Sequence, residues 1–264
     1  MQFDTIVIMA AFALSTYLAV HAFTGAYVRK ILAREYKMKQ LFGHEVKVDN
    51  HIYNHAVEDT LLGALADDIH NIKEAVYSGE WIYAQRVGAY IYSSNIATDN
   101  VFGRLSIFAC PLDFYTPQIA IRNGSRKKFL VSHVQTRIRN QELVWCEAGF
   151  DKNHDIYNEP GMQVDTLSIL SPEVLDVLQH APKNADILLK RNILYYYIPG
   201  SHAPEKILPA LLEHKQRALA ELNDNLYRWA RSAANQDKVA AIKATELAVT
   251  PRERFRRMRK DLNV

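Results

Sequence analysis

The stretch YTPQIAIRNGSRKKFLVSHVQTRI, residues 115–138, decides the class of fold that the sequence predicts. Two runs with many β-branched and aromatic residues, Tyr115–Arg122 and Lys128–Ile138, flank Asn123-Gly124-Ser125. Asn-Gly between two apolar runs is typical of a β-hairpin, because both residues accept positive φ at low cost. The stretch therefore predicts two antiparallel strands joined by a tight turn.

Further strand-like runs lie on both sides of this hairpin, and turn residues such as Pro160-Gly161 separate several of them. They are Gly88–Ser93, Arg104–Cys110, Glu142–Ala148, Val164–Leu170 and Asn192–Pro199. Short strands at such spacing favour an antiparallel sheet over βαβ units. One short helix fits among them, because Ser171 is a good N-cap, Pro172 suits the first helical position and Glu173 to His180 follow. We predict an α+β domain over residues 81–200.

Helical segments are predicted on both sides of the domain. In the juxtamembrane region 31–80, apolar residues at spacings of 3, 4, 3 and 4 predict a helix with one apolar face: Leu62, Leu65, Ile69, Ile72 and Val76. The stripe resembles a short coiled coil, and packing on the neighbouring domain is the alternative. Residues 201–264 predict a helix with Pro209 in its first turn, a helix from Asp237 to Ala248, and a last one that begins at Thr250-Pro251.

The N-terminal segment predicts a transmembrane helix. Residues 5–28 (TIVIMAAFALSTYLAVHAFTGAYV) contain no formally charged residue, and about 20 mostly apolar residues suffice to cross a bilayer as a helix. Asp4 precedes the stretch, and Arg29 and Lys30 follow it. Because Lys and Arg accumulate on the cytoplasmic side, we predict a single-pass anchor over residues 1–30 in a bacterial inner membrane, with the N-terminus outside and the body in the cytoplasm.

Two other interpretations of this segment stay open. Val20-His21-Ala22 resembles a signal-peptide cleavage site, although signal peptides normally have a basic start and a shorter apolar run. The segment is also compatible with a buried helix of a soluble protein.

The charge is concentrated at two places, although the net charge of the 264 residues is only +3. Residues 29–47 and 251–264 each hold six basic and two acidic residues, and the body between them is mildly acidic. Phe255, Met258 and Leu262 share one helical face in the second segment, which is typical of a helix that binds a membrane surface or a partner; a solvated tail is the alternative. The candidate membrane-surface residues are Arg29, Lys30, Arg34, Arg254, Phe255, Arg256, Arg257, Met258, Arg259 and Lys260.

Several short motifs follow one another between residues 99 and 199: Val101-Phe102-Gly103, Phe150-Asp151-Lys152, Leu170-Ser171-Pro172 and the run from Ile193 to Ile198. Their order resembles that of the bacterial domain of unknown function 3137 family. Ser171 departs from the threonine that is usual in the family. The resemblance implies a bacterial protein with hydrophobic segments before this domain. It implies no activity, because none is established for the family.

No catalytic constellation stands out in the sequence. His51, His55 and Asp59 would spread over about 12 Å of a helix, which is too far for one metal ion. We expect no cofactor, no metal and no nucleic-acid partner, since the folded body is not basic. The predicted function is a non-enzymatic membrane-anchored scaffold or interaction module, with membrane lipids and a protein partner or second copy as its partners. The alternative is an enzyme that acts on a lipid or cell-envelope precursor at the cytoplasmic leaflet.

Overall fold

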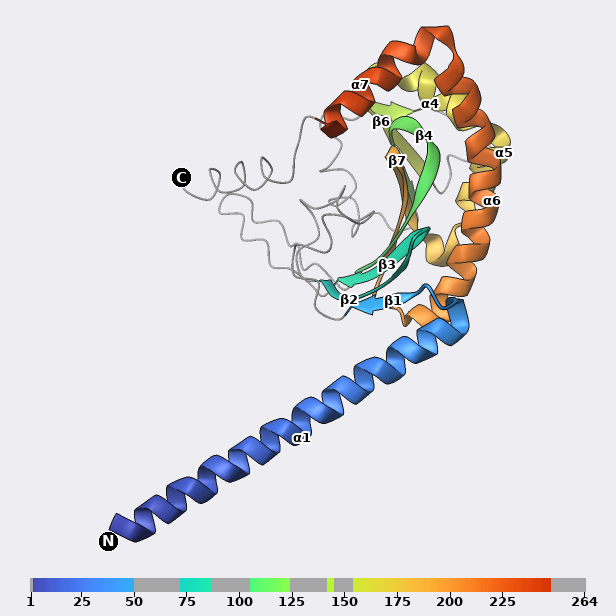
Figure 1. Ribbon diagram of the computed structural model, residues 1–264. Coiled ribbons are helices and arrows are strands. Elements are labelled where there is room, and N and C mark those ends of the chain that lie inside the picture. Colours follow the sequence, from blue (N-terminus) through green and yellow to red (C-terminus); the bar gives the residue numbers. More distant parts are fainter. Residues whose placement is uncertain (1, 50–71, 87–104, 124–141, 145–153, 248–264) are drawn as a thin grey trace, which may run out of the picture.

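The longest strand among the described residues, β4 (Leu105–Asn123), forms the centre of an antiparallel sheet (Figure 1). The computed structural model describes residues 2–49, 72–86, 105–123, 142–144 and 154–247. The strands follow the order β1-β2-β3-β4-β6-β5, and β7 also pairs with β4. Their bounds are Lys47–Asp49 for β1, Ile72–Ser78 for β2, Trp81–Arg86 for β3, Glu142–Val144 for β5, His154–Asn158 for β6 and Asp186–Pro199 for β7. The predicted α+β class with an antiparallel sheet is confirmed.

Strands β4 and β7 pair along almost their whole length, from Leu105 opposite Pro199 to Ile121 opposite Ile187. The ladder is irregular in its middle, where β4 advances five residues from Pro111 to Thr116 while β7 moves two, from Ile193 to Arg191. Extra residues in one strand form a bulge, which bends the strand and redirects side chains. The two runs predicted around residues 104–110 and 115–122 are therefore one strand with a bulge.

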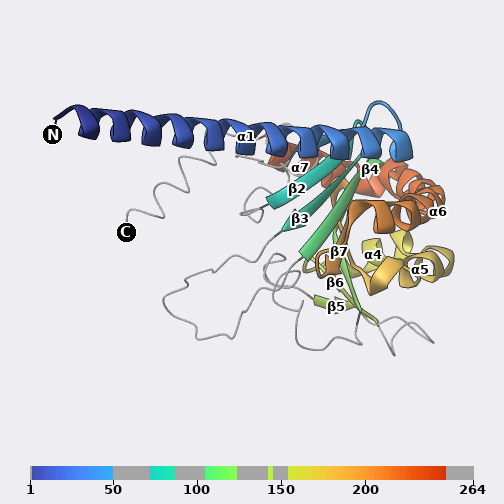
Figure 2. The same ribbon diagram turned by 90° about the horizontal axis from the view of Figure 1, so that it is seen from below.

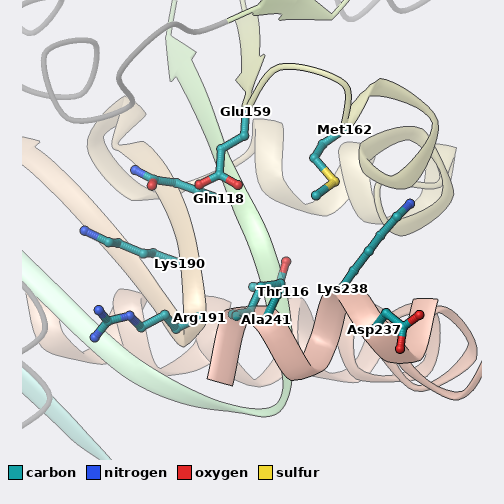
Figure 3. Close-up of a pocket in the computed structure, with 10 residues that line it drawn as sticks. Thr116, Gln118, Glu159, Met162, Lys190, Arg191, Asp237, Lys238 and Ala241 are labelled. Atoms are coloured by element: carbon teal, nitrogen blue, oxygen red, sulfur yellow. The ribbon is translucent and has the colours of Figure 1, made fainter. Parts of the chain in front are cut away.

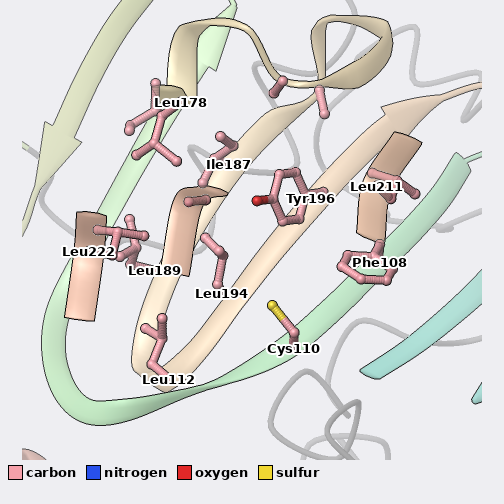
Figure 4. Close-up of a cluster of buried hydrophobic side chains, with 14 of the residues drawn as sticks. Phe108, Cys110, Leu112, Leu178, Ile187, Leu189, Leu194, Tyr196, Leu211 and Leu222 are labelled. Atoms are coloured by element: carbon pink, nitrogen blue, oxygen red, sulfur yellow. The ribbon is translucent and has the colours of Figure 1, made fainter. Parts of the chain in front are cut away.

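One face of the sheet is covered by three helices, α4 (Gln163–Ile169), α5 (Pro172–Gln179) and α6 (Pro204–Arg231) (Figure 1). Successive residues of a strand point to opposite faces, so alternate residues of β4 and β7 meet these helices. Figure 4 shows the resulting core, in which Phe108, Cys110, Leu194 and Tyr196 of the sheet lie among leucines of α5 and α6.

The opposite face of the sheet carries smaller and aromatic side chains. Ala84, Ala109, Leu188, Tyr195 and Tyr197 are buried there in a second apolar cluster. The sheet is thus buried on both faces, which explains why the sequence of β7 shows a continuous apolar run rather than an alternation.

Several predicted elements are confirmed. Helix α5 has Ser171 as its N-cap, and the Ser171 hydroxyl accepts a hydrogen bond from the Val174 amide at 3.5 Å. Helix α7 (Gln236–Leu247) matches the predicted helix after residue 237. Strand β5 covers the first part of the run predicted from Glu142. The runs 88–93 and 128–138, and the helix after residue 250, lie outside the described residues.

One predicted strand is wrong, and so is the end of one predicted helix, whose earlier residues Leu62, Leu65 and Ile69 lie outside the described residues. Val164–Leu170 is not a strand, because Asp165, Thr166 and Ile169 face the core with helical spacing in α4. Ile72 and Val76 do not continue a helix, because they belong to β2, which pairs with β1 and β3. In both cases packing against the rest of the fold overrides the local pattern. In addition, α6 begins at Pro204, so Pro209 lies inside the helix rather than in its first turn.

Helix α1 (Gln2–Phe42) is a single helix of 41 residues. Its N-terminal half extends away from the sheet and the helices that cover it (Figures 1 and 2). Within the part of the chain that the structure describes, no helix combines the length and the apolar character that crossing a membrane requires. The transmembrane anchor over residues 1–30 therefore stays a prediction.

Candidate functional site

Helix α1 exposes large apolar side chains along much of its length. Their exposed fractions lie between 42% and 66% for Leu14, Tyr17, Leu18, Tyr27, Val28, Leu32, Tyr36 and Leu41. Burial of such a side chain stabilises a protein by about 1.5–3 kcal/mol, so a row of exposed ones marks a surface that gains from an apolar environment.

The C-terminal part of α1 also has a face that is attached to the folded domain, through a set of contacts that we call the α1 clamp. Its members are Arg34, Lys37, Met38 and Phe42 of α1, together with Glu74, Trp81 and Glu205.

The ion pairs of the α1 clamp connect three elements. Arg34 donates from two nitrogens to both carboxylate oxygens of Glu74 on β2, with 2.9 Å between Nη2 and Oε2. Lys37 lies 3.3 Å from Glu205 in the first turn of α6. The Glu74 side chain is only 8% exposed, so water does not compete strongly with Arg34 for its carboxylate.

The apolar members of the α1 clamp add to these ion pairs. Met38 is fully buried, and the rings of Phe42 and Trp81 lie 6.3 Å apart in an edge-to-face arrangement. Such aromatic pairs contribute about 0.5–1.5 kcal/mol beyond the burial of their area. The last turns of α1 are therefore part of the domain core.

A partly buried turn positions the start of α6 for this contact. Tyr83 Oη and Gln85 Nε2 on β3 both donate to the carbonyl oxygen of His202, at 2.6 and 2.5 Å. Ser106 Oγ donates to the carbonyl of Gly200, whose φ of +93° is accessible to glycine without strain. Burial raises the pKa of Tyr83 to about 12, so the phenol keeps its proton at neutral pH. The turn holds Glu205 in place opposite α1.

A separate pocket of about 520 Å³ lies at the bulge between β4 and β7 (Figure 3). Small-molecule sites commonly have volumes of about 300–1,000 Å³. Its lining comes from β4, β7, the end of β6, the residue before α4, and α7: Thr116, Gln118, Glu159, Met162, Lys190, Arg191, Asp237, Lys238, Ala241 and Ile242.

The backbone at this pocket is unusual. Arg191 has a φ of +60°, which a residue with a side chain adopts only at a cost. Neighbouring residues of a regular strand point to opposite faces, yet Lys190 and Arg191 both line the pocket. The left-handed backbone at Arg191 interrupts the alternation. Two consecutive cationic residues therefore line one cavity, and Figure 3 shows their charged ends on the same side of it, away from Met162.

The charges around the pocket are largely paired. Lys238 Nζ lies 2.9 and 2.8 Å from the two carboxylate oxygens of Asp165, which also accepts a 2.9 Å hydrogen bond from Trp229 Nε1. Burial opposes ionisation of Asp165, but these bonds hold its pKa below the ordinary value. Burial raises the pKa of Glu159, and the nearby charge of Lys190 acts against that rise.

Two other titratable groups, the Cys110 thiol and the His214 imidazole, are buried in the core. Cys110 is a free, fully buried thiol whose pKa is raised to about 12 by burial. His214 Nε2 lies 3.0 Å from the Val177 carbonyl, which can only accept, so Nδ1 accepts from the Tyr196 hydroxyl at 3.0 Å. Burial lowers the pKa of His214. The imidazole is therefore neutral at pH 7 and links α5, α6 and β7.

The predicted membrane-surface residues of α1 lie in two different environments. Arg29 and Lys30 are exposed on α1, whereas Arg34 belongs to the α1 clamp. The C-terminal candidates from Arg254 to Lys260, and the His51–Asp59 group, lie outside the described residues.

The residues of the pocket could not be identified from the sequence because they are far apart in the chain. The only local signal was Lys190-Arg191 inside an apolar run.

No family model and no curated protein matches the sequence. Among solved structures, the crystal structure of the mycobacterial trehalose monomycolate transport factor A, TtfA, is similar with a TM-score of 0.44 and 12% identity. The similarity covers 74% of this chain and 94% of that one. A TM-score of this size transfers neither a fold nor a role. The resemblance to the domain of unknown function 3137 family stays a prediction.

Proposed function

We propose that this protein is a membrane-anchored interaction module, in which α1 holds the α+β domain at the cytoplasmic face of a bacterial inner membrane. The observation that carries the proposal is the division of α1 into two halves. Its first half exposes Leu14, Tyr17 and Leu18, whereas its last turns are fixed to the domain by the α1 clamp. A helix with this division is suited to hold a domain at an apolar phase.

The length of the uncharged stretch supports a bilayer as that phase. Residues 5–28 would extend about 36 Å as a helix, against about 30 Å for a hydrocarbon core. Arg29 and Lys30 follow directly and are exposed. Their position supports a cytoplasmic location for the body.

The contacts of the described residues favour a binding role over an enzymatic one. Among the side chains that line the pocket, the only hydroxyl is that of Thr116, which donates to the carbonyl of Pro117 at 3.0 Å. A nucleophile held by a neighbouring base is typical of covalent catalysis, and the Thr116 hydroxyl donates to a backbone carbonyl instead. An enzyme acting on a lipid or envelope precursor stays the alternative.

Anchoring and orientation are tested together in cells. For anchoring, carbonate extraction of the full chain is compared with that of a chain lacking residues 1–28. For orientation, Cys110 and Cys146 are first replaced by serine. Single cysteines are then introduced by Gln2→Cys and Glu221→Cys and labelled with a membrane-impermeant thiol reagent. We expect the full chain to resist carbonate, Cys at position 2 to react from outside, and Cys at position 221 to react only after permeabilisation. Extraction of the full chain by carbonate, or the opposite labelling, would overturn the proposal.

The interaction role has its own measurement. We expect the protein, purified from its native membrane in mild detergent, to have a protein mass larger than the 30.2 kDa of one chain. A protein mass equal to that of one chain, with no second protein present, contradicts that part of the proposal.

A further inference from the structure

The pocket at the β4–β7 bulge has features of a ligand site that the anchoring role does not explain. Glu159 and Lys190 are partly buried at its wall, and Arg191 holds a strained backbone beside them. Strained residues persist where the surrounding structure enforces them, and they gather at binding sites. We propose that this pocket binds a small amphiphile with one anionic head group, which Arg191 recognises.

The charge pairing around the pocket identifies the head-group residue. Lys238 is already bound to both oxygens of Asp165, and Lys190 faces the charge of Glu159. The backbone of Arg191 pairs with Thr116, but its guanidinium has no ion pair or hydrogen bond to any residue that the structure describes. A guanidinium presents paired N–H donors that match the oxygens of a carboxylate or phosphate. One unpaired guanidinium suits one anionic group.

The apolar residues of the lining indicate the chemistry of the rest of the ligand, apart from its head group. Met162 on one side and Ala241 and Ile242 of α7 on the other form apolar walls, and Figure 3 shows Met162 and Ala241 on opposite sides of the cavity. The apolar walls suit an apolar body, and the other seven lining residues, which are polar or charged, orient its polar end. The ligand class is therefore an acyl or alkyl chain with a terminal carboxylate or phosphate.

The backbone of Arg191 offers a variant that separates binding from folding. Glycine adopts a φ of +60° without a steric cost. Arg191→Gly therefore removes the guanidinium and relieves strain in one change, so the variant should unfold at a temperature at least as high as the wild type. Arg191→Lys keeps a positive charge but loses the paired donors.

The test is equilibrium dialysis of the full chain in maltoside micelles, with protein-free micelles as the blank. The probes are octanoate, octyl phosphate and octanol at pH 7. Arg217→Gln provides the matched control, because Arg217 is an exposed arginine on α6 that does not line the pocket.

We expect octanoate, octyl phosphate or both to bind above the blank, and octanol to bind at least tenfold more weakly. The preferred head group distinguishes a fatty-acid-like from a phospholipid-like ligand, and either supports the proposal. Arg191→Gly should weaken binding at least tenfold, Arg191→Lys less, and Arg217→Gln not at all. Equal binding of octanol and octanoate, unchanged binding by Arg191→Gly, or no binding above the blank by either anion would overturn it.

Discussion

The ion pair between Arg34 and Glu74 predicts how strongly α1 is coupled to the domain. The perturbation is a double-mutant cycle with Arg34→Met, Glu74→Met and the variant that carries both changes. Methionine has a similar length and no charge, so each single change removes the pair. Arg34→Met leaves Glu74 without this partner, and Glu74→Met leaves Arg34 with its 3.9 Å contact to Glu205.

The expected magnitudes follow from the exposure of the two side chains. Glu74 is 8% exposed and Arg34 is 33% exposed. Breaking a fully buried pair costs about 3–5 kcal/mol. Since water reaches the arginine, we expect about 2 kcal/mol for Arg34→Met. The double variant should lose less than about 1 kcal/mol, because two apolar side chains replace the whole pair.

Thermal unfolding of the full chain in detergent, followed by tryptophan fluorescence, measures these differences. Trp81 packs against Phe42 of α1, so it reports on the α1 clamp itself. For a chain of this size, 2 kcal/mol lowers Tm by about 4–8 °C. The reasoning is refuted if the double variant loses as much stability as the two single variants together, because independent losses mean that the residues are not coupled.

Two further predictions concern buried groups of the core. Because burial lowers the pKa of His214 below its ordinary 6.5, its neutral form contributes stability that is present above pH 6.5 and is lost as pH falls from 6.5 through its folded pKa. The unfolding free energy of the wild type should therefore decrease more between pH 7 and 5 than that of His214→Gln, and parallel curves would contradict this. Burial of the Cys110 thiol predicts that the Cys146→Ser variant reacts with maleimide only after denaturation; rapid labelling of the native protein at pH 7 would show that the thiol is accessible.

Sequence analysis succeeded where a local rule determines structure. Ser171-Pro172 started α5 as predicted, because a hydroxyl cap and a fixed φ act within one turn. The run from Ile193 to Ile198 formed a strand, because its apolar residues suit a sheet that is buried on both faces.

It failed where distant parts of the chain decide between two patterns. The segment around Val164 has residues that suit a strand, but Asp165 is held by Trp229 and Lys238, which lie more than 60 positions further along the chain. Spacing alone carries no information about such partners. The stripe that ends at Val76 failed for the same reason, since β3 and β1 pair with this segment.

The pocket was beyond prediction for a different reason. Its formation depends on the β4 bulge and on the left-handed backbone at Arg191, and neither follows from residue type. Arginine has no preference for positive φ. The sequence therefore does not indicate that the regular strand pairing is interrupted at position 191.

The unbroken course of α1 from Gln2 to Phe42 has a geometric consequence. An α-helix turns by about 100° and rises 1.5 Å per residue, and the α1 clamp fixes its last turns. One residue inserted between Val28 and Arg34 would rotate the domain by about 100° relative to the apolar half. Seven would return it to within about 20° while moving it about 10 Å outward. The number of residues in this interval therefore sets the rotational phase of the domain about the axis of α1.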